Sequence, residues 1–314
     1  SNVYLGSSND ITYDGHLIKL SPNLEQINSI FLNYGLKTSK VRKQLIQGGK
    51  TATMTTIGQK EIASTKIDVP FLQEQTKIAS FLSAIDEKIS QLTQKHQLLS
   101  QYKQGMMQKL FSQQIRFKAD DGSEFEGWEE TIFEKIGVFL KGKGISKADI
   151  VPDGKIPCIR YGELYTYYGE VISKIISSTN IEAKNLVLSK ANDILIPASG
   201  ETQIDIATAS CVLQDNIALS GDLNIFRTKE NGIFLSYLIR SKLKMQIAQL
   251  AQGNSVVHLY ASQLKGVSFS LPCLEEQTKI ANFLSAIDQK IEVVAQQIEQ
   301  AKQWKKGLLQ QMFV

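Results

Sequence analysis

Basic side chains gather on a glycine-bearing stretch near the middle of the chain. Lys141, Lys143 and Lys147 lie in this stretch, together with the small hydroxyl residue Ser146. Lysines on glycine-bearing loops can reach phosphate oxygens, which gives affinity for nucleic acid without selecting a base sequence. A solvated loop is the plainer alternative, and for any single lysine it is the better explanation.

The segment that follows, from Arg160 to Tyr168, combines residue types that can read base pairs. The guanidinium of Arg160 can donate two hydrogen bonds to guanine, and the carboxylate of Glu163 can accept one from the amino group of cytosine. Tyr161, Tyr165 and Thr166 add side chains able to abut bases or sugars. The alternative for this segment is an amphipathic strand with a tyrosine-rich exposed face.

Two more polar loops follow apolar runs. The candidate DNA contacts in the first are Ser199, Glu201 and Thr202, and those in the second are Asn254, Ser255 and His258. For both loops a solvated turn and a base-reading role are equally good interpretations.

The sequence offers no catalytic pattern. It lacks the cofactor loop and the Asn/Asp-Pro-Pro-Tyr/Phe tetrad of base-amino methyltransferases, and the phosphate loop of nucleotide hydrolases. It also lacks carboxylate–lysine spacing for a metal nuclease, zinc-ligand spacing and a nucleophile elbow. We therefore expect no catalytic residues, no metal site and no cofactor bound by this chain.

Composition sets broad limits. The 314 residues are enough for two hydrophobic cores, and 42% hydrophobic content is ordinary for a soluble protein. A net charge of +4 is compatible with nucleic acid but weak alone. Cys158, Cys211 and Cys273 are isolated, which favours reduced structural thiols. We expect no membrane span and no signal peptide, and a cytoplasmic location.

The elements that must position these residues are revealed by an internal repeat. Residues 69–89 read VPFLQEQTKIASFLSAIDEKI and residues 271–291 read LPCLEEQTKIANFLSAIDQKI, identical at 16 of 21 positions and 202 apart. The register then holds to the C-terminus. Nothing upstream of the first copy matches residues 114–213, so the first copy lacks the front of its globular segment.

Each copy continues into a heptad pattern that predicts a long helix, at about 73–112 and 275–314. About 38 residues make each helix roughly 55–60 Å long. We expect the two helices to pack antiparallel. The predicted seam contains Leu82, Ile85, Ile89, Leu92, Leu284, Ile287, Ile291 and Val294.

Short apolar runs separated by Gly, Pro, Asn and Asp predict a mixed α/β domain between the helices. Helices are expected at 28–46 and 231–251, and equivalent strands at 65–69 and 267–271. The expected division is a partial domain at 1–72, a helix at 73–113, a complete domain at 114–272 and a helix at 273–314. The fold class is therefore α+β, with an antiparallel coiled coil and an incomplete first domain.

The arrangement resembles the specificity subunit of a Type I restriction-modification enzyme. The resemblance covers essentially the whole chain and rests on three sequence features. The Pro-x-Leu-x-Glu-Gln-x-x-Ile stretch begins at Pro70 and again at Pro272, and Phe-Leu-Ser-Ala-Ile-Asp-x-Lys-Ile follows at 81–89 and 283–291. A target-recognition domain would open at Gly127-Trp128 and continue through 142–150, 156–166 and 194–202.

This resemblance implies a sequence-specific subunit without catalytic activity, which binds double-stranded DNA at a bipartite site. Methyltransferase subunits would dock on it and supply S-adenosylmethionine. Restriction and translocase subunits, joined through the methyltransferase, would use ATP and magnesium. The helices would act as a spacer that sets the distance between two half-sites.

The incomplete first copy implies an N-terminally truncated member, whether natural, rearranged or engineered, and a homodimer is one way to supply a second half-site. The alternative is a coiled-coil adaptor, or an inactive truncated paralogue, without DNA binding.

Overall fold

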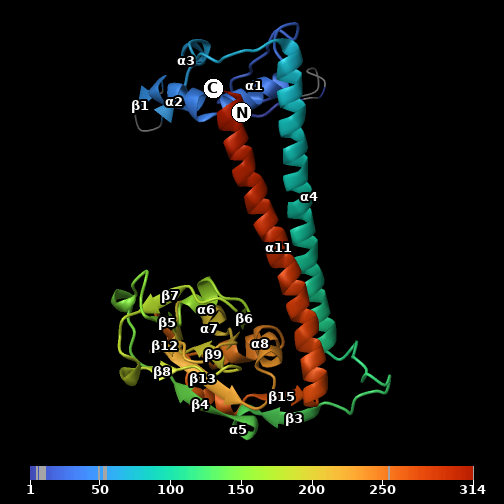
Figure 1. Cartoon of the computed structure of the whole chain (residues 1–314), viewed down its shortest axis with the longest axis vertical. Helices are drawn as coiled ribbons and strands as arrows, with labels where there is room; N and C mark the ends of the chain where they lie inside the picture. Colours follow the sequence, from blue (N-terminus) through green and yellow to red (C-terminus); the bar gives the residue numbers. More distant parts are fainter. Residues whose placement is uncertain (5, 7–11, 49, 52–54, 254, 314) are drawn as a thin grey trace. The chain divides into compact units, whose positions relative to one another are not determined.

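A computed structural model describes residues 1–4, 6, 12–48, 50–51, 55–253 and 255–313 of the chain. The chain divides into two compact units. Unit 1 comprises Ser1–Leu98 and Ile291–Val314, and unit 2 comprises Leu99–Lys290. Figure 1 follows the elements along the chain, and each of the two long helices contributes one part to each unit.

Unit 1 holds short elements ahead of the first long helix. They are α1 (Ser29–Leu36), α2 (Ser39–Gly48), β1 (Lys50–Thr51), β2 (Thr55–Thr56) and α3 (Gln59–Ala63). The single helix predicted at 28–46 is wrong, because the chain leaves the helix after Leu36 and Thr38 starts a new one. The Thr38 hydroxyl donates to the carbonyl of Gly35 at 2.7 Å and accepts from the amide of Val41 at 3.5 Å.

The two long helices are confirmed as α4 (Leu72–Phe111) and α11 (Leu274–Met312). In unit 1 the early part of α4 meets the late part of α11, where Leu82 and Ile85 pack with Leu308 and Met312. In unit 2 the late part of α4 meets the early part of α11. The helices therefore run antiparallel within each unit, as predicted.

The predicted seam is buried. Leu82, Ile85, Leu92, Leu284, Ile287 and Val294 lie in the core, and Ile89 and Ile291 are half-buried. In unit 1, Leu82, Ile85 and Ile89 pack with α11 residues, as apolar side chains repeating at spacings of 3 and 4 do between paired helices.

The repeated glutamine of the Pro-x-Leu-x-Glu-Gln motif anchors the start of each long helix. Gln75 donates to the carbonyl of Pro70 at 2.8 Å and accepts from the amide of Asn28 at 2.9 Å. Gln277 makes the same two bonds, to Pro272 at 2.8 Å and from Asn231 at 3.0 Å. Asn28 and Asn231 are themselves the N-caps of α1 and of α8 (Gly232–Arg240), so one side chain ties a long helix to the short helix beside it.

A tyrosine–aspartate–lysine group joins the helices in each unit. In unit 1 the Tyr34 hydroxyl donates to Asp86 at 2.7 Å, and Lys305 pairs with the same carboxylate. In unit 2 the Tyr237 hydroxyl donates to Asp288 at 2.5 Å, and Lys103 pairs with Asp288 at 2.7 Å. Each lysine also lies over the tyrosine ring, at 5.1 Å in both units. We call these groups the two clamps.

Unit 2 contains the mixed α/β domain, which confirms the predicted fold class. Its five-stranded sheet has the order β4 (Gly137–Lys141), β13 (Leu223–Thr228), β9 (Ile194–Pro197), β11 (Ser210–Val212) and β6 (Val171–Ile172). Its four-stranded sheet has the order β7 (Ser177–Thr179), β5 (Ile156–Ile159), β12 (Ala218–Leu219) and β8 (Val187–Leu188). Two pairs complete it: β10 (Ser199–Gly200) with β14 (Val257–His258), and β15 (Ser268–Leu271) with β3 (Glu129–Ile132).

The helices of this domain are short. They are α5 (Phe133–Ile136), α6 (Glu163–Thr166), α7 (Gln203–Ile206), α8 (Gly232–Arg240), α9 (Lys244–Leu250) and α10 (Ala261–Lys265), with 3-10 turns η1 (Lys147–Asp149) and η2 (Ala183–Asn185). The single helix predicted at 231–251 is therefore wrong. It breaks where the hydroxyl of Ser241 bonds the carbonyl of Tyr237 at 2.6 Å and the Ser241 backbone leaves the helical region.

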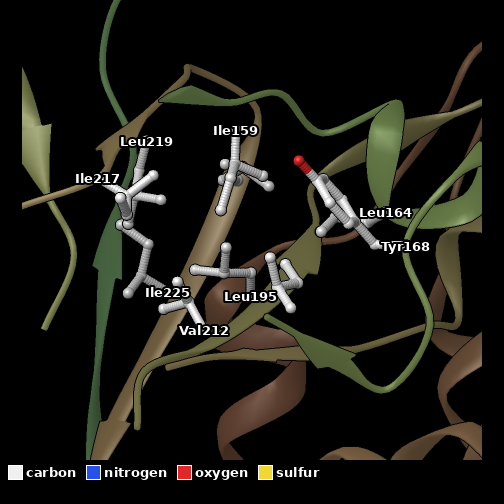
Figure 2. Packing of buried hydrophobic residues seen from close by; sticks show 10 residues of the cluster. Ile159, Leu164, Tyr168, Leu195, Val212, Ile217, Leu219 and Ile225 are labelled. Carbon is white, nitrogen blue, oxygen red and sulfur yellow. The ribbon is translucent and has the colours of Figure 1, made fainter. Parts of the chain in front are cut away.

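The domain core lies between the strands and the segment that contains α6. Figure 2 shows Ile159, Leu164, Tyr168, Leu195 and Val212 directed toward one another. Most of this cluster is fully buried. The core therefore packs against the residues just after β5 and within α6 and fixes their position.

The strand predicted at 267–271 is confirmed as β15, but residues 65–69 form no strand. In unit 2, β15 pairs antiparallel with β3 along four residues. Residues 65–69 have no such neighbour among the described residues, and an extended segment becomes a strand only by pairing.

Candidate nucleic-acid interface

The basic loop after β4 is held by its backbone and presents its lysines. Lys141, Lys143 and Lys147 are exposed. The Lys143 amide donates to the carbonyl of Leu219 at 3.0 Å. A Cβ on Gly142 would lie 1.9 Å from the carbonyl oxygen of Ser220, so this close approach requires glycine. A fixed backbone thus carries exposed cationic side chains, as phosphate contact requires.

Ser146 has a local structural role in this loop. Its amide and its hydroxyl both donate to the carboxylate of Asp149, at 2.7 and 2.6 Å. These hydrogen bonds lower the pKa of Asp149. The pair caps η1 and keeps the loop beside it in one conformation.

Arg160 and Glu163 are bonded to each other. The Glu163 carboxylate accepts from the amide of Arg160 at 3.0 Å, from its Nε at 3.2 Å and from the hydroxyl of Ser177 at 2.6 Å. Only 5% of Glu163 is exposed. Because its acceptors are already used inside the protein, Glu163 holds Arg160 in place rather than presenting a free acceptor to a base. This differs from the expectation drawn from the sequence.

The tyrosines after Arg160 divide between core and surface. Tyr168 is buried, and burial raises its pKa to about 12. Tyr161 and Tyr165 are half-buried, Thr166 is exposed, and the Thr166 hydroxyl donates to the carbonyl of Gly162 at 2.8 Å. Tyr167 is 63% exposed and was missed, since the sequence alone does not say which tyrosine of a run faces out.

Arg240, on α8, binds backbone carbonyl groups of the segment that carries Arg160 and the tyrosines. Its guanidinium donates to the carbonyls of Leu164 and Tyr168 at 2.8 Å each, and to Ala209 at 2.6 Å. Burial lowers its pKa. The segment that carries Arg160 is thus held from two sides.

The third and fourth predicted loops lie together. β10 pairs with β14 so that Ser199 faces His258, and the Ser199 hydroxyl lies 3.1 Å from His258 Nδ1. Tyr260 stacks on the His258 ring at 6.2 Å and is 54% exposed, a second residue that sequence patterns did not reveal.

The other residues predicted for these loops have separate roles. Thr202 accepts from the amide of Asp205 at 3.1 Å and so caps α7. Glu201 and Ser255 are exposed. Asn254 lies outside the described residues.

The four segments converge. The amide of Ser220 bonds the carbonyl of Ile159, next to the bond between Lys143 and Leu219, which brings the basic loop beside Arg160. Burial raises the pKa of Tyr165, and the nearby groups of Tyr161, Glu201 and Asp205 raise it further. We call the exposed part of residues 141–147, 160–167, 199–203 and 255–260 the recognition surface.

Metal ligation is not visible in the part of the chain that the structure describes, and two of the three cysteines are buried. Those residues contain no cluster of His, Cys, Asp or Glu placed to hold a metal ion. Cys158 and Cys211 are buried, and burial raises their pKa to about 11 and about 12, so both are held as thiols. No helix among the described residues has the length and apolarity to span a bilayer.

A model of the Type I restriction modification DNA specificity domain matches residues 4–101 and 126–303. The chain belongs to this family. Members of it are specificity subunits, which carry no catalytic activity, and this agrees with the absence of catalytic patterns in the sequence.

Two relatives from Methanocaldococcus jannaschii extend the match along almost the whole chain. The type I MjaX specificity subunit is 28% identical over 315 residues, which is 98% of this chain and 72% of the relative. The type I MjaVIII specificity subunit is 25% identical over 326 residues, covering 98% of this chain and 74% of the relative.

Solved structures show the same fold. The S subunit of a Type I restriction-modification system from M. genitalium gives a TM-score of 0.58 at 16% identity, over 93% of this chain and 74% of that one. A chain solved in work on complex assembly and conformational transition of the type I R-M system gives 0.55 at 16% identity, over 93% and 72%.

Proposed function

We propose that this specificity-family chain recognises one DNA half-site through the recognition surface of unit 2. The observation that carries the proposal is the convergence of four separate segments, one of them basic, on a single domain of a DNA-specificity fold. Such a surface provides both of the contact classes that sequence-specific binding needs, to phosphates and to base edges.

The residues divide between these classes. Lys141, Lys143 and Lys147 contact phosphates, because they are exposed cations on a loop whose backbone is fixed. Arg160 reads guanine in the major groove, and its bond to Glu163 fixes the direction of its guanidinium before DNA arrives.

The remaining contacts come from the opposite loops. Tyr167 and Tyr260 supply exposed aromatic faces, and the linked pair Ser199 and His258 supplies hydrogen-bonding atoms. With Tyr165, Thr166, Glu201 and Ser255 at their margins, these loops select bases next to the one that Arg160 reads.

Chemistry on the DNA belongs to partner subunits in this proposal. Methyltransferase subunits dock on the outer faces of α4 and α11 and bring S-adenosylmethionine. Restriction and translocase subunits join through them and use ATP and magnesium. The chain itself contributes recognition and the two antiparallel helices.

Co-expression with Type I methyltransferase subunits, followed by sequencing of methylated DNA, tests the function. We expect a stable complex that methylates a defined site, and Arg160→Ala should relax that site at one base pair. If the chain is instead a coiled-coil adaptor, the complex will form but its methylation pattern will not respond to any change on the recognition surface.

A further inference from the structure

Arg240, the last residue of α8, donates hydrogen bonds to acceptors on two segments that lie apart in the sequence. The acceptors are the carbonyls of Leu164 at 2.8 Å, Tyr168 at 2.8 Å, Gly169 at 3.0 Å and Ala209 at 2.6 Å, and the hydroxyl of Ser210 at 3.0 Å. A guanidinium carries five N–H groups in a rigid fork, whereas a lysine has three on a flexible stem. This set of acceptors therefore requires an arginine.

Three of these acceptors belong to the turn that ends α6. Leu164 lies within α6, and Tyr168 and Gly169 follow its last residue, Thr166. The last carbonyls of a helix have no partner inside the helix, so they must find one elsewhere. Arg240 provides that partner and so fixes the end of α6.

The same turn is bonded to the residue that orients Arg160. The backbone carbonyl of Glu163 accepts from the amides of Tyr167 at 3.0 Å and Tyr168 at 2.8 Å. The carboxylate of Glu163 accepts from Arg160 Nε at 3.2 Å. A shift of the turn therefore moves Glu163 and, with it, the guanidinium of Arg160. The exposed ring of Tyr167 depends on the same bonds, because Tyr167 lies inside the turn.

The residue that follows this turn is anchored to the first long helix. Lys103, on α4, donates to the two carboxylate oxygens of Glu170 at 3.0 and 2.9 Å, and each of these side chains is only 14% exposed. On α8, Tyr237 bonds Asp288 of α11. Within unit 2, the turn after α6 is thus connected to α4 through Glu170 and to α11 through α8 and Arg240.

The other repeat carries a lysine at the place of Arg240. Arg240 lies three residues after the clamp tyrosine Tyr237, and Lys37 lies three residues after the clamp tyrosine Tyr34. Lys37 is exposed. The helix that carries the clamp tyrosine is therefore compatible with lysine at this place, and it is the set of acceptors in unit 2 that calls for arginine.

We infer that Arg240 is a positioning residue for base reading. It acts from outside the recognition surface, and it sets the directions of Arg160 and Tyr167 through the turn that it holds. This role rests on the proposed reading of DNA by the recognition surface.

The test is Arg240→Lys in the methyltransferase complex, with binding titrations on matched DNA and on DNA that carries each single mismatch. The change keeps the charge and introduces the residue found in unit 1, but it removes the fork. We expect discrimination to fall about tenfold at the base pair that Arg160→Ala relaxes, because a bidentate contact needs a correctly directed guanidinium. The double variant with Arg160→Ala should lose no more at that base pair than Arg160→Ala alone. The salt dependence of affinity should stay unchanged, because the phosphate contacts remain.

Arg227→Lys is the matched control. Arg227 also bonds through Nε and an NH2 nitrogen, both at 2.7 Å, but its partner is the carboxylate of Asp193, outside the recognition surface. This variant should lower the melting temperature and leave the base preference unchanged. An equal loss of discrimination in Arg227→Lys would show that general destabilisation, and not the hold on the turn, affects base reading.

The outcomes separate this role from the proposed function. If Arg160→Ala relaxes one base pair and Arg240→Lys leaves that base pair unchanged, Arg240 has no positioning role and the proposed function stands. If Arg160→Ala relaxes no base pair, base reading by Arg160 is itself wrong.

A second variant covers the case in which Arg240→Lys does not assemble. Ser210→Ala removes one acceptor of Arg240 and the bond that the Ser210 hydroxyl donates to the carbonyl of Gly169 at 2.7 Å. We expect a loss of discrimination of about threefold at the same base pair, since one neutral hydrogen bond contributes about that much. No loss in this variant would contradict the role of Arg240.

Discussion

Asp86 and Asp288 hold equivalent places in the two clamps, yet their pKa values move in opposite directions. Burial raises the pKa of Asp86, but hydrogen bonds from Lys305 and Tyr34 outweigh it and the net pKa is lowered. Burial raises the pKa of Asp288 and prevails, because Lys103 is shared with the carboxylate of Glu170, 2.9 Å away. One lysine serves two acids in unit 2.

We therefore predict that carbon-detected NMR titration will place the pKa of Asp86 below 3.8 and that of Asp288 above it. The folded state of unit 1 then gains stability from Asp86 above pH 3.8 and loses it as pH falls through the lowered pKa. For Asp288 the contribution is present below pH 3.8 and is lost as pH rises through the raised pKa. Equal pKa values would contradict the account.

The Asp288 prediction has a thermodynamic counterpart. Asp288→Asn keeps the shape but removes the titration, so the free energy of unfolding of the wild type relative to this variant should fall as pH rises from 3.8. Urea denaturation at several pH values measures it. The control is Asp153→Asn, at an exposed acid of the same unit.

At the recognition surface, Arg160→Ala and Lys143→Ala should separate specificity from affinity. Loss of Arg160 should cost about 1–3 kcal/mol at one base pair and little elsewhere. Loss of Lys143 should weaken every sequence alike and reduce the slope of log affinity against log salt by about 1. Binding titrations of the methyltransferase complex with matched and single-mismatch DNA distinguish them, and equal losses on all sequences would contradict direct readout by Arg160.

Sequence patterns located these segments but not the use of each side chain. The basic loop and the loops that meet at Ser199 and His258 were found from residue types after strand ends. The hydrogen bonds that Glu163 accepts could not be predicted from the sequence. One of them comes from Ser177, which only the fold brings close to Glu163. The outward direction of Tyr167 depends equally on tertiary packing.

At the scale of elements, Gln75 and Gln277, which anchor the two long helices, should each contribute more to the free energy of unfolding than the residues beside them. Gln277→Ala would leave the half-buried amide of Asn231 and the buried carbonyl of Pro272 without their partner, at a cost of about 1–3 kcal/mol. Chemical denaturation measures the loss. Gln73→Ala, at an exposed position of α4, should stay within about 0.5 kcal/mol.

A charged side chain placed in the seam should lower the free energy of unfolding. Ile85→Asp and Ile287→Asp each place a carboxylate in a buried position without a partner, which should cost several kcal/mol, roughly 3 or more. Leu98→Asp is the control, because 56% of Leu98 is exposed on the same helix. A similar loss for all three variants would show that burial in the seam does not determine stability.

The long helices were predictable because their pattern is repeated over many turns and is satisfied locally. The breaks at Thr38 and Ser241 were not, since one hydroxyl residue within an apolar period is compatible with a continuous helix. The missing strand at 65–69 has a different cause. Its alternating pattern is present, but a strand needs a neighbour such as β3, and the described residues place none beside it. Instead, the Gln44 side chain bonds the backbone amide and carbonyl of Lys66, both at 2.9 Å.

For the whole molecule, we predict recognition of a single half-site, because the segments of the recognition surface all lie in unit 2 and the described residues of unit 1 include no counterpart of them. Light scattering on the purified chain, then sequencing of DNA methylated by its methyltransferase complex, tests this. A complex with two copies of the chain should select an interrupted palindrome. A complex with one copy that selects two different half-sites would contradict the prediction.

The clamps bear on how the internal repeat evolved. Lys305, in the second repeat, neutralises Asp86 in the first, and Lys103, in the first repeat, neutralises Asp288 in the second. A single ancestral repeat with both residues could not have joined them within one straight helix, because they lie about 17 residues apart, roughly 25 Å. It would have needed a sister molecule. Gene duplication would then have fused an obligate pair into one chain, and each repeat still depends on the other.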